Sequence, residues 1–502
     1  MKNTTLKKLF SLIITVILVF SLSACGMYKA SSPAMSPGNY YGGELSGESY
    51  TEINENAFVS TAENPNSYFS IDANTASYPN LRSLIANGSV NIPKDAVRVE
   101  EMLNYFDYEY ETPSDDTVLS LTSSVFDTPY NKETKLLTIG LAAKQVEFSG
   151  IRNNLVFLID VSGSMYSSDK LPLVQQAFMM LTENLNPEDR VSIVTYASGD
   201  SVALSGAFGY EKQKIMAAIE DLTAGGSTAG SKGIRRAYAL AEEYFIEGGN
   251  NRVILATDGD FNVGVSTTWG LEELISKKRD SGIYFSVYGF GRGNIQSDKM
   301  ETLALKGNGV YSYIDSVNEA KRALVEGIGG SMVTVAKDVK AGITFNPEYV
   351  QSYRLVGYEN KLLTEEEFND SNTDAGELGS GHTVTVVYEI VMTDNELSDG
   401  GNLADVIIKY KPTENVGGDA TEEKQLTLAI GTDRYHTDMT PSDAFISCVV
   451  EFALILRDSE HKADSDINAL ITRLSSIDLT GDEFKSEFRE LVITYREGIE
   501  NK

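Results

Sequence analysis

NLVFLIDVSGSM, residues 154–165, is the stretch that decides the fold class of this chain. From Asn154 to Asp160 it is a nearly continuous apolar run, which is typical of a strand buried on both faces of a sheet. The run ends in a carboxylate at Asp160, and Ser162 and Ser164 follow with only a glycine between the two serines. A buried strand that ends in one carboxylate and two hydroxyl groups predicts a polar site at the edge of a sheet.

Similar strand patterns recur between residues 151 and 330, and helical patterns lie between them. Further strands are expected at 190–196, 252–258, 283–290 and 310–314, and helices at 174–185, 215–222, 233–245, 270–280, 297–306 and 318–330. Strands that alternate with helices predict a mostly parallel sheet with right-handed crossovers and helices on both faces. We therefore assign residues 151–330 to an α/β domain with a doubly wound sheet.

Residues 58–150 and residues 331–502 have patterns that differ from this central domain. The N-terminal segment has one apolar helical face over residues 99–106 and two strand-like runs between residues 118 and 143, so an α+β segment is expected. In the C-terminal segment, alternating runs precede helical patterns that begin at Ser442. This order predicts a domain of antiparallel strands followed by helices.

Residues 1–24 have the features of a secretory signal peptide: a basic start, an apolar run over residues 9–22 and small residues at the exit. The apolar run is shorter than the roughly 20 residues that a membrane-spanning helix needs. The exit, LSAC at residues 22–25, resembles the lipobox of bacterial lipoproteins, in which the cysteine, here Cys25, is acylated and begins the mature chain. The alternative is a standard signal peptide that is cleaved near Ala24.

A lipid anchor at Cys25 would also determine where the protein works. Two or more acyl chains, palmitate among them, would hold the protein stably on a membrane, whereas one chain would bind only marginally. Residues 25–57 are rich in Ser, Gly, Tyr and Asn without an apolar period, so a flexible tether is expected there. Cys448 lies in an apolar stretch and is expected to be a small core residue. The predicted location is the extracytoplasmic face of a bacterial cell membrane.

Composition excludes several classes of function. The net charge is −30, with 72 acidic and 42 basic side chains, and such a surface repels the phosphate backbone of nucleic acids. His382, His436 and His461 lie far apart, and the chain contains no G-x-S-x-G elbow that would present a nucleophile. No paired general acid and base is visible either, so we predict that the protein is not an enzyme.

Oxygen donors follow the strands of the central domain at corresponding places. Asp160, Ser162 and Ser164 come at the end of one strand, Asp258 at the end of another, and Thr228 in the glycine-rich loop AGGSTAGSKG. These are hard oxygen donors, which suit Mg²⁺, Mn²⁺ or Ca²⁺ and not zinc or copper. Ser, Thr and Asp are also common at helix caps and turns. That alternative is open for the neighbouring Ser227 and Asp260, which we leave outside the predicted metal site.

The motifs DVSGSM, GGST and TDGD, in this order in an α/β domain, resemble the Rossmann-like von Willebrand factor type A (VWA) domain. Its metal-ion-dependent adhesion site (MIDAS) follows the pattern D-x-S-x-S, then a distant Thr, then a distant Asp. The resemblance assigns these positions to Asp160, Ser162, Ser164, Thr228 and Asp258. It implies that hydroxyl groups contact the metal directly, that the aspartates often act through water, and that a carboxylate of a partner protein completes the site.

The flanking segments extend the resemblance. SYFSIDANTASYPNLR and FNPEYVQSYRLVGYEN are similar to parts of bacterial surface lipoproteins that carry a VWA domain between family-specific N-terminal and C-terminal segments. The implied function is that of a lipid-anchored binding protein that docks an acidic side chain of an unidentified partner on a divalent cation. Mg²⁺ is the expected ion, with Ca²⁺ and Mn²⁺ as alternatives. The other hypothesis is an envelope scaffold or assembly factor whose flanking domains make the contacts, while the metal is structural.

Overall fold

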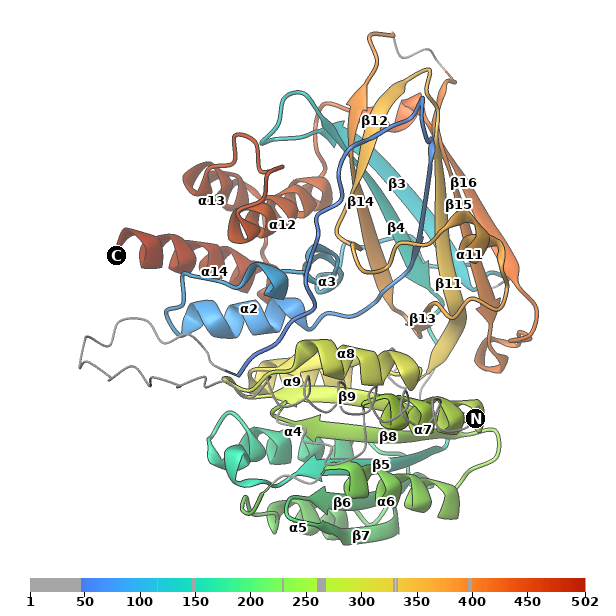
Figure 1. The fold of residues 1–502 in the computed structure, drawn as a ribbon, viewed down its shortest axis with the longest axis vertical. Coiled ribbons are helices and arrows are strands. Elements are labelled where there is room, and N and C mark those ends of the chain that lie inside the picture. The colour runs from blue at the N-terminus through green and yellow to red at the C-terminus, as the bar shows by residue number, and fades with distance from the viewer. Residues whose placement is uncertain are drawn as a thin grey trace, which may run out of the picture. The chain divides into compact units, whose positions relative to one another are not determined.

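The computed structural model describes residues 47–114, 116–146, 150–227, 230–259, 268–327, 330, 333–395 and 400–501 (Figure 1). The predicted signal peptide, the predicted lipid attachment site Cys25 and the predicted metal ligand Thr228 lie outside these residues. Within the described ranges, no helix has both the length and the apolar character that crossing a membrane requires.

The central domain contains a six-stranded sheet in the order β10-β9-β8-β5-β6-β7 (Figure 1). Its strands are β5 (Asn153–Asp160), β6 (Arg190–Tyr196), β7 (Asp200–Phe208), β8 (Asn250–Thr257), β9 (Ile283–Phe290) and β10 (Tyr311–Ile314). β7 pairs antiparallel with β6, and the other pairings in this sheet are parallel. The predicted mostly parallel sheet is confirmed. The strand β7 was not predicted, because it lies at the sheet edge and much of its first half is exposed.

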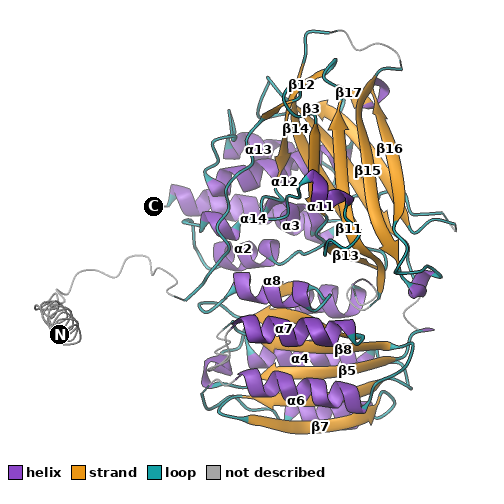
Figure 2. Ribbon diagram, turned by 45° about the vertical axis from the view of Figure 1, so that its right-hand side comes forward, coloured by secondary structure: helices purple, strands orange, loops and turns teal. Residues whose placement is uncertain are grey.

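Helices cover both faces of this sheet (Figure 2). They are α4 (Leu171–Glu183), α5 (Lys212–Glu220), α6 (Gly230–Glu243), α7 (Thr268–Asp280), α8 (Ser297–Lys306) and α9 (Val317–Lys321), with a π-helical turn at Arg322–Glu326. The central strand β5 shows why two layers form. Its residues Leu155 and Phe157 belong to one apolar core with α4 and α5, whereas Val156 and Leu158 belong to another with α6, α7 and α8. The predicted doubly wound arrangement is confirmed.

The segments before and after the central domain share two further sheets. The first has the order β1-β12-β14-β4-β3-β17, and the second has the order β13-β11-β15-β16, with β2 also paired to β11. The strands are β1 (Val59–Ser60), β2 (Asn66–Ser70), β3 (Leu119–Asp127), β4 (Lys135–Ala143), β11 (Thr334–Phe345), β12 (Val350–Val356), β13 (Gly376–Gly379), β14 (Thr383–Met392), β15 (Asn402–Pro412), β16 (Lys424–Gly431) and β17 (Tyr435–His436). Because β4 pairs with β14 and β2 with β11, the two flanking segments build one β structure together.

Helices from both flanking segments surround a third apolar core. They are α2 (Ser77–Ala86), α3 (Val99–Asn104), α12 (Pro441–Arg457), α13 (Ile467–Ser476) and α14 (Glu483–Glu500), and a short helix α11 (Glu365–Asn369) follows β12. The ring of Phe106 contacts Phe445 and Phe488 edge-to-face in this core. Cys448 is fully buried there, as expected. The predicted order of the C-terminal region, strands and then helices, is confirmed.

The end of the predicted tether differs from expectation. Ser49 exchanges backbone hydrogen bonds with Ile295 and Ser297, and the side chain of Asn56 donates to the carbonyl oxygens of Leu355 and Gly357 at 3.0 and 2.9 Å. The described part of the predicted tether, residues 47–57, therefore packs on the folded body. Its polar composition reflects hydrogen bonding to other segments, which composition alone does not reveal.

Candidate metal site

Two of the predicted metal ligands are placed at the ends of neighbouring strands. β5 ends at Asp160, and β8 ends at Thr257, one residue before Asp258. The two strands are paired in parallel, with Ile159 opposite Ala256, so their carboxyl ends meet at the same edge of the sheet. Both aspartates are buried, with 0% and 1% of their surface exposed. The sheet therefore brings two carboxylates together in a place that water does not reach freely.

Asp160 is held by neutral hydrogen-bond donors. Its Oδ1 accepts the backbone N–H of Ser162 at 2.9 Å, and its Oδ2 accepts the hydroxyl of Thr257 at 3.2 Å. Burial raises the pKa of Asp160 to about 6; the hydrogen bonds from Ser162 oppose this shift, and the charge of Asp258 adds to it. In the described part of the chain, no lysine, arginine or histidine forms an ion pair with Asp160. This carboxylate lacks a cation.

The serines follow in a tight turn that leads into a 3-10 helix, Gly163–Tyr166. The hydroxyl oxygens of Ser162 and Ser164 lie 3.0 Å apart, so both point to the same side of the turn. Glycines of the loop predicted to carry Thr228 support it: Gly225 N–H donates to the carbonyl of Val161 at 2.7 Å. The structure thus places the described part of that loop, up to residue 227, against the DVSGSM turn.

Gly226 has a specific reason to be a glycine. Its φ is +86°, and a Cβ at this position would lie 2.6 Å from the hydroxyl oxygen of Ser198. Its carbonyl oxygen accepts the backbone N–H of Gly163 at 3.0 Å, which fixes the two loops to each other. A side chain at this position would be strained by the positive φ and would displace the hydroxyl group of Ser198.

Lys170 is the residue at this site that the sequence analysis missed. Its Nζ lies 2.7 Å from Oδ2 of Asp258, and both side chains are buried. Gly291, at φ +71°, makes room for it, because a Cβ there would lie 2.3 Å from the lysine side chain. No spacing rule pairs Lys170 with Asp258, since the two residues meet only when α4 is laid against the sheet. The ammonium group neutralises Asp258 and leaves Asp160 as the uncompensated charge.

These residues fit a hard divalent cation. The donor set consists of carboxylate and hydroxyl oxygens, and the described part of the site contains no imidazole or thiolate. A buried carboxylate without a cation is costly, and a metal ion removes that cost. Ser162 and Ser164 could contact the ion directly, with Asp160 and Asp258 behind them.

The rim of the site is exposed. Tyr166, at the end of the 3-10 helix that contains Ser164, has 83% of its surface exposed, which is high for a tyrosine. Near it in sequence, Asp169 lies 3.9 Å from Arg292. Tyrosine is enriched at protein interfaces because it offers a large contact area at a low entropy cost. An aromatic side chain beside the buried oxygens suits a surface that another protein covers.

A second group of acids, Asp72, Glu101 and Glu301, is close enough to hold an ion. It already contains cations, however. Lys361 Nζ lies 2.9 Å from both Asp72 and Glu301, and Arg98 lies 3.0 Å from Glu301. Burial raises the pKa of Glu101 to about 8, which keeps that carboxyl largely protonated. We therefore interpret this group as a compensated structural network, in contrast to Asp160.

Comparisons with known families agree with this geometry. The family model "von Willebrand factor type A domain" matches residues 154–326, and a model named "von Willebrand factor" matches residues 44–138. The C-terminal model of the uncharacterized protein YfbK matches residues 330–497. The two outer models cover the flanking segments that share the β structure.

Two relatives illustrate the range of similarity. Protein YfbK of Escherichia coli (strain K12) is 40% identical over 357 residues, which are 70% of this chain and 62% of YfbK. Inter-alpha-trypsin inhibitor heavy chain H3 of Homo sapiens is 26% identical over 270 residues, which are 49% of this chain and 29% of that protein. The chain thus spans less than two thirds of the length of these relatives.

Solved structures are similar at lower levels of identity. A von Willebrand factor type A protein from Catenulispora acidiphila is 15% identical, with a TM-score of 0.38 over 78% of this chain and 89% of that one. Proximal thread matrix protein 1 of the mussel byssus, with a zinc-occupied MIDAS motif, is 21% identical, with a TM-score of 0.29 over 35% of this chain and 44% of that one. The family models thus assign a VWA domain to residues 154–326 and a YfbK-type C-terminal region to residues 330–497, and the chain is similar to protein YfbK over 70% of its length.

Proposed function

We propose that this protein binds a divalent cation through Asp160, Ser162, Ser164, Thr228 and Asp258 and uses the ion to dock an acidic side chain of a partner protein. The observation that carries the proposal is the state of Asp160, a fully buried carboxylate that accepts hydrogen bonds from neutral donors, the N–H of Ser162 and the hydroxyl of Thr257 among them, and that forms no ion pair with the described residues. A cation at this edge of the sheet would supply the missing charge.

The donor set also suggests how the ion would act. Neutral hydroxyl groups in direct contact leave most of the charge of a divalent ion in place, so the ion attracts an anionic ligand from outside. The exposed ring of Tyr166 would then lie at the border of the contact. This role is one of binding and needs no nucleophile or general base. Mg²⁺ is the ion we expect, with Ca²⁺ and Mn²⁺ as alternatives.

The proposed place of action is the extracytoplasmic face of a bacterial membrane, with lipid attached to Cys25. The support is the apolar run of residues 9–22 and its exit LSAC. Cells fed labelled palmitate should label the natural protein and not a Cys25→Ser variant. Equal labelling of both proteins would contradict the proposed lipid anchor and would leave the proposal of metal binding unaffected.

Partner docking is tested by affinity capture from solubilised bacterial envelopes with Mg²⁺ or with chelator. The natural protein should retain a partner in Mg²⁺ only, and Asp160→Ala should retain none. Asp169→Asn is the matched control, because it removes a nearby carboxylate that is not among the proposed ligands. Capture by Asp160→Ala, or by the natural protein in chelator, that equals capture by the natural protein in Mg²⁺ would contradict metal docking and favour the envelope scaffold hypothesis, in which the flanking domains bind.

A further inference from the structure

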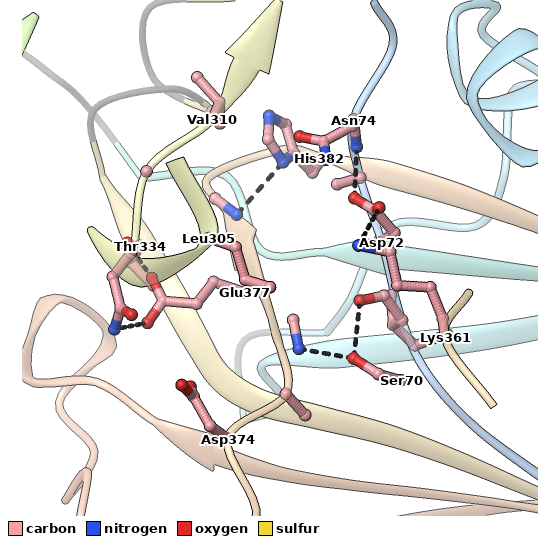
Figure 3. Close-up of a pocket in the computed structure, with 18 of the residues that line it drawn as sticks. Ser70, Asp72, Asn74, Leu305, Val310, Thr334, Lys361, Asp374, Glu377 and His382 are labelled. Carbon is pink, nitrogen blue, oxygen red and sulfur yellow. Dashed lines mark hydrogen bonds and ion pairs between the residues drawn. The ribbon is translucent and has the colours of Figure 1, made fainter. Parts of the chain in front are cut away.

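A cavity of about 210 Å³ lies where the VWA domain meets the flanking β structure (Figure 3). Arg252 of β8 lines it, together with Leu305 in the last turn of α8 and Val310 just before β10. The opposite wall comes from the flanking segments and includes Lys361 and Glu377. One water molecule needs roughly 10–15 Å³ of such volume, so the cavity is large enough for a small organic molecule.

Arg252 is the unusual member of this wall. Only 1% of its surface is exposed, and burial lowers the pKa of its guanidinium group. Its Nη1 donates to the hydroxyl of Ser286 at 2.8 Å, its guanidinium carbon lies 5.2 Å from the ring centre of Tyr284, and its Nε has no hydrogen-bond partner. Across the described residues, no carboxylate lies within ion-pair distance of it. Arginine is almost never fully buried without a counter-ion.

The carboxylates around the cavity have other partners. Asp72 is paired with Lys361 at 2.9 Å, and Asp374 with Arg279 at 3.1 Å. Glu377 accepts hydrogen bonds from Thr334, at 3.1 Å, and from Asn308. Figure 3 shows Glu377 turned toward Thr334, and Asp72 beside Lys361.

The titratable groups nearest to Arg252 balance its charge only in part: burial lowers the pKa of the arginine, and the charge of Glu377 opposes this shift. Burial raises the pKa of Glu377 to about 7, so this carboxyl is only partly charged. Burial lowers the pKa of His382 to about 4, and its Nδ1 accepts the backbone N–H of Gly379 at 3.3 Å, so the ring is neutral. The cavity therefore presents a guanidinium group that forms no ion pair with the described carboxylates and whose Nε has no hydrogen-bond partner.

We infer that this cavity binds a small molecule with a single carboxylate group, and that this carboxylate pairs with Arg252. One guanidinium calls for one negative charge, and its planar edge matches the two oxygens of a carboxylate. The apolar side chains of Leu305 and Val310 would contact the rest of the molecule. The site is independent of the proposed metal site, because none of the four proposed metal ligands that the structure describes lines the cavity.

The test uses the full-length protein with butyrate as the probe. Melting is followed in sodium butyrate and in sodium chloride of equal ionic strength, and binding of labelled butyrate is measured by equilibrium dialysis. Butyrate should raise Tm by about 1–2 °C over chloride and bind at one site per chain, and Arg252→Met should lose both effects. No difference from chloride, an equal response in Arg252→Met, or a larger response to phosphate than to butyrate would overturn the inference.

Stability without ligand separates a binding arginine from a structural one. Arg354 is the matched control, since it is also buried but pairs with Glu389 at 2.7 Å. Arg252→Met should leave the urea midpoint unchanged or raise it, because it removes a buried charge that has no counter-ion. Arg354→Met should lower the midpoint. If Arg252→Met lowers it as much as Arg354→Met does, Arg252 is a structural residue and the inference fails.

Discussion

The carboxyl edge of the VWA sheet and the junction between α9 and the flanking helices handle buried charge in opposite ways. At the sheet edge, Asp160 has neutral hydrogen-bond donors and no ion pair among the described residues. At the junction, Arg82 lies 2.6 Å from Asp315, 2.9 Å from Glu319 and 2.8 Å from Glu487. Asp160 has no cation among the described residues, whereas each of the three carboxylates in the second arrangement is paired with a guanidinium group.

This difference separates two roles for buried charge. Arg82 comes from α2, Asp315 and Glu319 from the end of the VWA domain, and Glu487 from α14, so one guanidinium joins three parts of the fold. A complete network of this kind stabilises the arrangement of segments. An incomplete one costs stability and is expected where a ligand supplies the missing charge. Three substitutions test the distinction, and a fourth tests a buried titratable group outside both regions.

Arg82→Met should have the largest effect. It leaves the buried carboxylates of Asp315 and Glu319 without one of their cations, and the free energy of unfolding should fall by about 4 kcal/mol. Urea denaturation measures this change. Arg489→Met is the control, because its ion pair with Glu490 lies at the surface, with 31% and 64% of the two side chains exposed, and should be worth less than about 1 kcal/mol. Similar losses in the two variants would contradict a structural role for the Arg82 cluster.

Asp160→Asn should have the next largest effect, and on metal binding instead of folding. The variant keeps the size of the side chain and removes the charge, so Mg²⁺ should bind about 100-fold more weakly, about 3 kcal/mol. Calorimetric titration gives the affinity. Without metal, the variant should be at least as stable as the natural protein, because the uncompensated buried charge is gone. If the metal-free variant is much less stable than the metal-free natural protein, the charge of Asp160 has a structural role, as the charge of Arg82 does.

His382 tests a buried group that belongs to neither cluster. Burial and the nearby charge of Arg322 lower its pKa from 6.5 to about 4. Between these pH values the unfolded chain binds a proton that the folded chain does not, so stability present above pH 6.5 is lost as the pH falls toward 4. This loss should amount to about 3 kcal/mol.

The corresponding variant is His382→Asn, which keeps an acceptor for the N–H of Gly379 but cannot titrate. Urea midpoints measured from pH 7 to pH 4.5 should fall less steeply in the variant than in the natural protein. Parallel pH profiles would show that the ring is not held neutral by the fold.

The elements of the VWA domain could be predicted from the sequence because each depends on a local pattern. The apolar run that ends at Asp160 marks a buried central strand, and the helices between strands have a clear periodicity. The predicted positions of Asp160 and Asp258 at strand ends are likewise local. The edge strand β7 could not be found in this way, because its exposed positions are polar and its pattern is weak.

Contacts between distant segments could not be predicted. Ile139 of β4 pairs with Val386 of β14, although the whole VWA domain lies between these two residues in the sequence. No local sequence pattern indicates such a partner. The same holds for the pairing of Lys170 with Asp258, which depends on where α4 lies. Thr228 is a predicted ligand outside the described residues, so its role stays a prediction.

Lys170→Met should give the smallest effect and the sharpest test of the comparison. A metal ion bound beside Asp258 shares this carboxylate with an ammonium group 2.7 Å away, and two cations so close repel each other. Removing the ammonium group should therefore tighten Mg²⁺ binding about tenfold, about 1.4 kcal/mol, while destabilising the metal-free protein.

Titration calorimetry on Lys170→Met and on Lys462→Met, an exposed lysine of the C-terminal segment, measures this difference. Tighter binding in Lys170→Met alone would mean that the ammonium group of Lys170 partly replaces the metal ion. It would stabilise the metal-free site and lower the affinity of the site for the ion. Weaker binding would mean that the ammonium group orients Asp258 for the ion. Lys170 would then be a structural partner of Asp258, as Arg82 is of its carboxylates. Asp160 would be the one remaining difference between the two regions.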